Sequence, residues 1–243
     1  MIKFSELPYQ RVTVEAVTES VEKTLASLDA AKTAQEASAV IRQSFQDDIE
    51  LTTDLQVAQV RYQINTKDEF YKAENDYADE NGPAIQLAQK RVTDAILDSR
   101  FRPELEKEFG ALMFRKFENR RRLLNETILP ELQEENRLTS RYSELLGGAE
   151  IEFDGKMLNL SQFDPYRQSP DRSTRKAATD AFFGWFAGHQ AELDELYSKL
   201  VNVRNTIAKK LGFSSGVELG YARMERFDYD ESMVKTYRED VKK

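Results

Sequence analysis

Apolar residues recur at the spacing of an α-helix along most of this chain, and few residues interrupt that pattern. Thr13, a good N-cap residue, precedes a stripe formed by Val14, Val17, Val21, Leu25 and Leu28. Only 10 Gly and 6 Pro occur in 243 residues, so the chain has few sites for sharp turns. Because 32% of the residues are charged, the pattern predicts long helices with solvated outer faces.

Further apolar stripes predict the other helices of the first half. One helix starts near Thr33, and a separate third run continues to Thr66, which can cap the helix that follows. Asn81-Gly82-Pro83 is the clearest break in this half, since Gly and Pro both interrupt helices. Behind Pro103, which suits a first helical turn, one long helix is predicted to extend to Leu124.

The middle of the chain contains the only β signal in the sequence. A helix restarting at Pro130 is predicted to stop at Gly147-Gly148. Beyond it, the short apolar stretches 151–153 and 156–158 flank Asp154-Gly155, a pair preferred by two-residue type I′ hairpins. A lone hairpin is marginally stable, so we expect it to dock on helices.

The last part of the chain returns to helical spacing. Ser169-Pro170-Asp171 predicts a helix start with Ser169 as its cap, and Gly212 predicts a later stop. Ser214 or Ser215 is expected to cap a short helix, and Asp230 a final one.

These patterns predict an all-α fold of stacked, long, antiparallel helices with one small β-hairpin near 151–158. The predicted organisation has an N-terminal helical region over 1–146, the hairpin and its connecting loop over 147–165, and a second helical region over 166–243.

Charge and composition exclude several classes of function. The net charge of −8 disfavours binding to nucleic acid, whose phosphates attract clusters of Lys and Arg. The absence of Cys excludes disulfides, thiol catalysis and Cys-based metal sites. The sequence shows neither a signal peptide nor a long apolar run, so we expect no membrane span and a cytoplasmic protein.

Metal and nucleophile chemistry find little support in the sequence. A zinc-peptidase helix needs two His one turn apart with a neighbouring Glu, whereas this chain has a single histidine, His189. We interpret His189 as structural, and expect no catalytic, cofactor-binding or metal-binding residue in this chain. Ser214-Ser215-Gly216 reads as a helix cap, because no G-x-S-x-G motif is present.

Two pairs of adjacent acids and one basic cluster remain as candidate sites. Asp47-Asp48 and Glu134-Glu135 are expected by chance among 43 acids, so solvated helix faces are favoured over a glycosidase or metal site. Arg120-Arg121-Arg122 is the densest basic cluster, with Arg115 and Lys116 one turn earlier. A solvated face offset by the nearby Glu118 and Glu126 is favoured, and contact with an anion or a peptide carboxylate is the alternative.

An aromatic band, Phe182-Phe183-Gly184-Trp185-Phe186, cannot all face one core, since neighbouring residues on a helix point about 100° apart. Burial between packed helices is favoured over a binding surface, which stays the alternative.

The order and spacing of several motifs in the second half resemble the thimet-type oligopeptidases, and most closely the bacterial oligoendopeptidase F group. The motifs are Ile151-Glu152-Phe153-Asp154-Gly155-Lys156, Ser169-Pro170-Asp171-Arg172 with Arg175 and Ala178, the stretch from Leu193 through Leu196-Tyr197, Leu200-Val201, Arg204 and Ala208 to Leu211-Gly212-Phe213, and Tyr221, Met224-Glu225-Arg226 and Phe227-Asp228-Tyr229.

The resemblance implies a zinc metallopeptidase that cleaves short peptides in a channel between two helical halves. Its His-Glu-x-x-His helix lies downstream of the matched region, so no zinc ligand is carried over to this chain, which is expected to be inactive alone. The implied role is one wall of the channel, with short peptides and the missing C-terminal catalytic part as partners and zinc bound by the complete enzyme. This reading predicts an exposed apolar surface where the catalytic part packs. A stand-alone helical scaffold or adaptor that binds a protein partner is the alternative, and it predicts no such surface.

Overall fold

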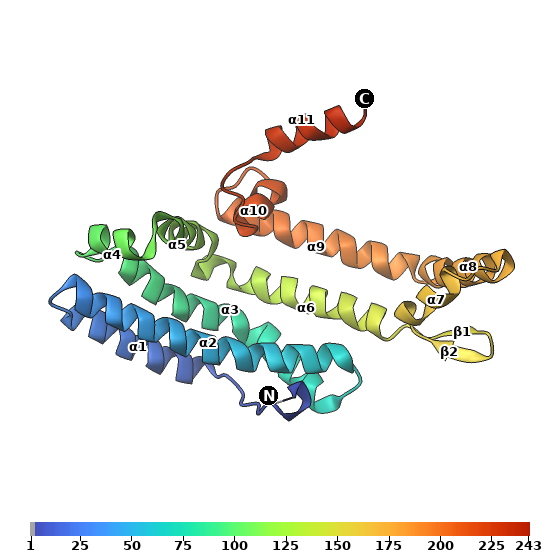
Figure 1. Cartoon of the computed structure of the whole chain (residues 1–243), viewed down its shortest axis with the longest axis horizontal. Coiled ribbons are helices and arrows are strands. Elements are labelled where there is room, and N and C mark those ends of the chain that lie inside the picture. The colour runs from blue at the N-terminus through green and yellow to red at the C-terminus, as the bar shows by residue number, and fades with distance from the viewer. Residues whose placement is uncertain (1–2) are drawn as a thin grey trace.

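The computed structural model describes residues 3–243, and within them the chain is almost entirely helical, which confirms the predicted all-α fold (Figure 1). The helices are α1 (Val14–Ala30), α2 (Ala34–Ile64), α3 (Glu69–Leu97), α4 (Arg102–Phe109), α5 (Ala111–Leu123), α6 (Leu129–Gly147), α7 (Asp164–Arg167), α8 (Arg172–Gly188), α9 (Gln190–Lys210), α10 (Gly216–Arg223) and α11 (Glu231–Val241). Short 3-10 helices cover Phe4–Glu6, Glu126–Ile128 and Leu160–Phe163. None of the helices in this described part is long and apolar enough to cross a membrane.

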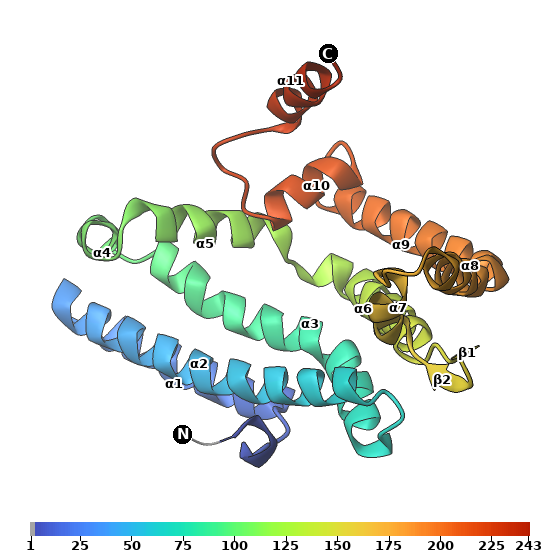
Figure 2. The ribbon, with the colours of Figure 1, turned by 45° about the vertical axis from the view of Figure 1, so that its right-hand side comes forward.

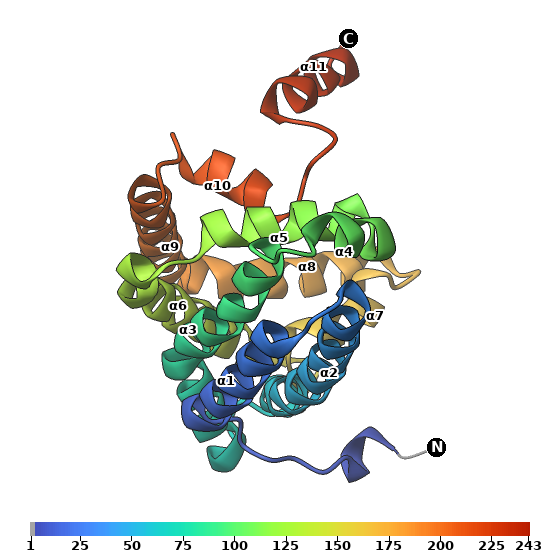
Figure 3. The ribbon, with the colours of Figure 1, turned by 90° about the vertical axis from the view of Figure 1, so that its left-hand side faces the viewer.

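Helices α1, α2 and α3 form the N-terminal layer and lie side by side in Figures 1 and 3. The predicted cap is confirmed at Thr13, whose hydroxyl accepts from the N–H of Ala16 at 3.2 Å. Val17 and Val21 of α1 pack on Ile85 of α3, and all three side chains are buried. The apolar stripe read from the sequence is therefore the face by which α1 joins the layer.

Helix α2 corrects the prediction of two separate runs ending at Thr66. It is continuous, since no Gly or Pro lies between its two apolar stripes. The next helix is capped by Asp68 and not by Thr66. One carboxylate oxygen of Asp68 accepts from the N–H groups of Phe70 at 3.0 Å and Tyr71 at 3.1 Å, which satisfies two free donors of the first turn.

Helix α3 corrects the prediction of a break at Asn81-Gly82-Pro83, because it passes through all three residues. Pro83 has no N–H to donate to the carbonyl of Asp79, one turn earlier. Asn136 of α6 donates its side-chain amide to that carbonyl at 3.1 Å. The packed neighbour therefore supplies the hydrogen bond that proline removes, and Pro83 itself is buried.

The prediction of one long helix behind Pro103 is wrong in one respect. Gly110 divides this stretch into α4 and α5. Gly110 has φ 91° and ψ 144°, a conformation that residues with a Cβ rarely adopt. The place of Pro103 in the first turn is confirmed. The apolar spacing continues through Gly110 because both helices contribute to one core, with Leu105 and Phe114 buried.

A second core joins α6 to α9 and α10. Its buried members include Leu138 of α6, Leu196 and Ile207 of α9, and Leu219 of α10. This core contains helices from both sides of residues 147–165, the segment at which the sequence predicts a division of the chain. Helix α6 thus contacts the N-terminal layer through α3 and the C-terminal helices through α9.

The β-hairpin is confirmed where it was predicted. Strands β1 (Ile151–Phe153) and β2 (Lys156–Leu158) pair antiparallel, with Ile151 opposite Leu158. Asp154 and Gly155 have φ values of 52° and 69°, as a type I′ turn requires. The hairpin docks on α8, where Leu158, Phe163 and Ala178 form a small buried cluster.

The start of α8 corrects a predicted cap. Asp171, rather than Ser169, accepts from the N–H of Thr174 at 2.7 Å. Hydroxyl and main-chain donors around it hold the pKa of Asp171 well below its ordinary value. The prolyl residue at 170 therefore lies before the helix.

The last two helices begin where the sequence predicts. Ser215 caps α10, and Asp230 caps α11 by accepting from the N–H of Met233 at 3.0 Å. The predicted stop at Gly212, with φ 79°, is confirmed at the end of α9. Helix α11 stands apart from the other helices in Figures 1, 2 and 3, and none of its residues is buried.

Candidate functional site

His189 lies between α8 and α9, where it links the two helices. Its Nδ1 lies 2.8 Å from the carbonyl oxygen of Trp185, and its ring stacks on the indole at a centroid distance of 4.1 Å. No group of three or more His, Asp or Glu side chains that could hold a metal ion occurs in residues 3–243. The side chains of these residues therefore do not fit the zinc that the resemblance implies.

The serines near 215 are used in capping. Ser215 Oγ accepts from the N–H of Glu218 at 3.2 Å, and the hydroxyl of Ser214 donates to the Glu218 carboxylate at 2.7 Å. The two donors of Ser214 lower the pKa of Glu218. The interpretation of this motif as a helix cap is confirmed.

The side chains of the adjacent acids Glu134 and Glu135 lie in different environments. Glu134 makes a half-exposed ion pair with Arg137 at 3.0 Å. Glu135 is buried and accepts from Arg204 Nε at 2.7 Å and from Arg223 Nη1 at 2.9 Å. It thereby connects α6 to α9 and α10. The predicted solvated face holds for Glu134, whereas for Glu135 it is wrong.

The arginine partners of Glu135 were missed by sequence reasoning. They lie 69 and 88 positions along the chain, and no local spacing links them to the acid.

Most cations of the basic cluster are engaged by other elements. Arg121 donates to Asp94 at 2.9 Å and to both oxygens of Asp98, which ties α5 to α3. Arg122 lies over the ring of Phe213 at 5.2 Å, a cation–π arrangement. Glu118, expected to offset the cluster, pairs with Arg102 instead.

The two residues one turn earlier are also engaged. Arg115 donates to the main-chain oxygen of Phe227 at 2.8 Å, and Lys116 pairs with Glu225 at 2.6 Å.

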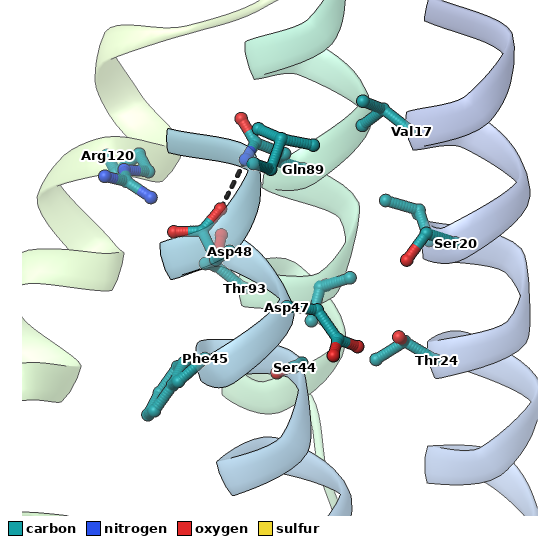
Figure 4. A pocket seen from close by; sticks show the side chains of 13 residues that line it. Val17, Ser20, Thr24, Ser44, Phe45, Asp47, Asp48, Gln89, Thr93 and Arg120 are labelled. Atoms are coloured by element: carbon teal, nitrogen blue, oxygen red, sulfur yellow. Dashed lines mark hydrogen bonds between the residues drawn. The ribbon is translucent and has the colours of Figure 1, made fainter. Parts of the chain in front are cut away.

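Arg120 differs from its neighbours. Its side chain is exposed, and within the described residues it forms neither an ion pair nor a hydrogen bond. It borders two adjoining hollows that share Asp48, Gln89 and Arg120. Figure 4 shows Arg120 on α5 on one side of Asp48 of α2, and Gln89 of α3, joined to Asp48 by the dashed hydrogen bond, on the other.

We call the two hollows together the Arg120 groove. The smaller hollow has a volume of about 90 Å³ and lies among α1, α2 and α3. The larger has a volume of about 450 Å³. It is lined by Asp48, Thr52, Gln86, Gln89, Arg120, Leu123, Leu124, Leu132, Glu135 and Arg223. Two separate sequence candidates, Asp47-Asp48 and the basic cluster, therefore meet at one groove.

The aromatic band divides between both predicted environments. Phe182 packs against Phe163 at 6.0 Å and lies under the guanidinium of Arg167 at 4.3 Å. Phe183 is 55% exposed. The band thus contributes one ring to the hairpin core and leaves another at the surface.

Apolar side chains are also exposed on the helices that follow. Tyr197 of α9 is 72% exposed. On α11, Met233, Tyr237 and Val241 recur every four residues and are 56%, 68% and 68% exposed. This spacing places the three on one face of α11, which we call the α11 stripe.

An all-helical architecture of this form occurs in peptidases of known structure. A chain described as an oligoendopeptidase F from Bacillus anthracis strain Ames superposes with a TM-score of 0.94 and 38% identity, over 99% of this chain and 44% of that one. PZ peptidase A, solved with an inhibitor, gives 0.93 and 39% over 98% and 42%. A further oligoendopeptidase F chain gives 0.95 and 38% over 100% and 43%.

Residues 4–124 match the peptidase M3 N-terminal domain. The chain belongs to the peptidase M3 family, which confirms the resemblance to the N-terminal portion of an oligoendopeptidase. It spans less than half the length of the solved chains that it matches. A comparison with curated proteins gives no significant match.

Proposed function

We propose that this chain is the non-catalytic helical portion of a zinc oligopeptidase, a protease that hydrolyses short peptides, and forms one wall of its substrate channel. The match to the N-terminal domain of the M3 peptidases supports this role. So does the coverage of 42–44% of the solved relatives, because a catalytic part fits in the remaining length.

The α11 stripe is the observation that carries the proposal. An isolated helix of 11 residues is marginal in water, since most helical stability comes from packing of an apolar face. Helix α11 has such a face, yet none of its residues is buried against residues 3–230. A catalytic part that packs on Met233, Tyr237 and Val241 supplies the missing burial.

Several further statements belong to the same proposal. The zinc is held by a His-Glu-x-x-His helix outside residues 1–243, and this chain alone is inactive. The protein acts in the cytoplasm on short peptides, with the catalytic part as its partner. The division into 1–146, 147–165 and 166–243 is proposed as the organisation of the wall.

The coding sequence beyond Lys243 tests the proposal directly. We expect an open frame of several hundred codons that contains His-Glu-x-x-His. The longer protein should then cleave an internally quenched peptide, whereas residues 1–243 should not. A native stop codon directly after the codon for Lys243 would refute the proposal.

A second test addresses the α11 stripe. In the longer protein, Tyr237→Asp should reduce thermal stability, because it places a charge in the proposed interface. In the 243-residue chain the same change should leave the melting temperature unchanged. Lys235→Glu, on the same exposed helix, is a control that alters charge beside the stripe.

The alternative of a stand-alone scaffold or adaptor predicts no exposed apolar surface, so the exposure of the α11 stripe argues against it. A native stop codon after Lys243, together with a partner that protects α11 from hydrogen exchange, would favour it.

A further inference from the structure

Arg120 has the features of an unused anion-binding group. Arg121 and Arg122 beside it are held by Asp94, Asp98 and Phe213, so their charges are engaged elsewhere. The guanidinium of Arg120 has no partner in residues 3–243 and borders a groove. A guanidinium presents several N–H donors in a planar fork, which matches a carboxylate.

The wall of the groove adds neutral donors. Gln86 and Thr52 line the larger hollow, and their side chains form no hydrogen bond with other described residues. Leu123 and Leu132 provide apolar surface beside them. A ligand with one carboxylate and an attached apolar or amide-containing body fits this combination of donors and apolar surface.

The pairing of charges at the groove leaves Arg120 as the group available to an anion. Glu135 is matched by both Arg204 and Arg223, which leaves an excess of positive charge at that end. Asp48 is the one other carboxylate of the larger hollow, and one of its oxygens already accepts from Gln89. Asp47 lines the smaller hollow, so three acids and three arginines, Arg204 included, balance at the groove. Arg120 is the arginine among them that pairs with no acid of the described residues.

We propose that the Arg120 groove binds the carboxylate of a peptide, with Arg120 as the group that pairs with it. The identity of the ligand as a peptide rests on the proposed function. Recognition of a carboxylate rests on the groove itself. Gln86 and Thr52 donate to the main chain of the ligand, and Asp48 opposes the carboxylate and weakens its binding.

The test uses the 243-residue chain and three probes. The probes are tetra-alanine with a free carboxylate, the same peptide with a C-terminal amide, and an amidated, acetylated peptide with one Glu among alanines. Binding is followed through the side-chain Nε–H resonance of Arg120 and the main-chain resonances of the groove. The probes separate a terminal carboxylate from a side-chain carboxylate.

We expect the free-acid peptide to bind about tenfold more tightly than its amide, the effect of one charge-assisted hydrogen bond. Arg120→Gln should remove that preference, and Asp48→Asn should tighten binding. Higher ionic strength should weaken it, because the groove is open to solvent. Arg172→Gln, an equal charge change on α8, should have no effect.

Equal binding of acid and amide, or unchanged binding by the Arg120→Gln variant, would overturn the proposal. Main-chain resonances outside the groove report whether each variant stays folded. Because the assay needs no catalytic part, its failure would leave the proposed peptidase role untouched. Failure of the peptidase role would likewise leave carboxylate binding measurable.

Discussion

The side-chain amide of Asn136 on α6 donates to the main-chain carbonyl of Asp79 on α3, at a distance of 3.1 Å. Pro83 leaves this carbonyl without its usual intrahelical donor. Gln133, also on α6, donates in the same way to the carbonyl of Glu80 at 2.8 Å. The continuity of α3 through a Gly-Pro pair therefore depends on a helix about fifty residues further along the chain.

Asn136→Ala should lower the free energy of unfolding by about 1–3 kcal/mol, because it leaves a partly buried carbonyl without a partner. In a Pro83→Ala background the cost should shrink, since an N–H at position 83 can donate to Asp79. Urea unfolding of the four proteins in this cycle measures the coupling. An equal cost in both backgrounds would show that the bond to Asp79 is unrelated to the proline. Asn202→Ala, at an exposed site on α9, is the control.

Glu135 and Glu134 offer a matched pair of neighbouring acids. Glu135→Ala should destabilise the chain by about 3 kcal/mol, the lower end for a buried ion pair, since Arg204 is itself half exposed. Glu134→Ala should cost about 0–1 kcal/mol, because its pair with Arg137 is half exposed. Thermal and urea unfolding of both variants measure the difference. Similar costs for the two would contradict a cross-linking role for Glu135.

Alanine substitutions at Gly110 and Gly82 test which of these two glycines interrupts a helix. An added Cβ meets no atom within 4 Å at either glycine, so only the backbone conformation distinguishes them. Gly110→Ala should destabilise by about 1–3 kcal/mol, owing to its positive φ. Gly82→Ala should stabilise by about 0.5–1 kcal/mol, because it lies within a continuous helix. Stabilisation by both changes would contradict the break at Gly110.

Glu74 should make stability depend on pH. Its carboxylate accepts from Arg11 Nε at 2.9 Å and from the hydroxyl of Tyr9 at 2.5 Å. Hydrogen bonds from Arg11, above all, hold the pKa of Glu74 below its ordinary value. The stabilisation is therefore present above the unfolded-state pKa of about 4.3 and is lost as pH falls through the lower folded-state pKa.

Glu74→Gln should accordingly cost about 1–3 kcal/mol near neutral pH and progressively less below pH of about 4. Asp79 provides the contrast, since burial raises its pKa and its contribution to stability falls as pH rises through that value. Asp79→Asn should therefore remove a slope of the opposite sign. Unfolding free energies measured from pH of about 3 to 7 test both signs. A cost of Glu74→Gln that is independent of pH would contradict the role of the ion pair.

Local signals predicted those elements whose cause lies within a few residues. The cap at Thr13 and the type I′ turn at Asp154-Gly155 follow from side-chain hydrogen bonding and backbone sterics alone. At Ser169 the same reasoning chose the wrong polar residue. Ser169 accepts from the N–H of Asp171, before the helix begins, whereas Asp171 accepts three hydrogen bonds from Ser173 and Thr174 in its first turn.

The Arg120 groove could not be predicted from the sequence, because its residues come together only in the tertiary structure. Asp48 and Arg120 are far apart in the sequence, and each looked like part of a solvated helix face. Packing of α2, α3 and α5 brings them to one hollow, and pairing elsewhere engages Arg121 but not Arg120.

The sequence by itself determined the helical class, the hairpin, most helix ends and the family resemblance, because periodicity, capping and turn preferences act over a few neighbouring residues. Tertiary structure alone decided that α3 continues through Pro83 and that Glu135 becomes a buried cross-link. It also decided which arginine stays free. The first two depend on donors that lie 57 to 88 positions away, and the third on acceptors of Arg121 that lie 23 and 27 positions away. Many alternative partners have the same local character. Only the packed arrangement of the helices selects among them.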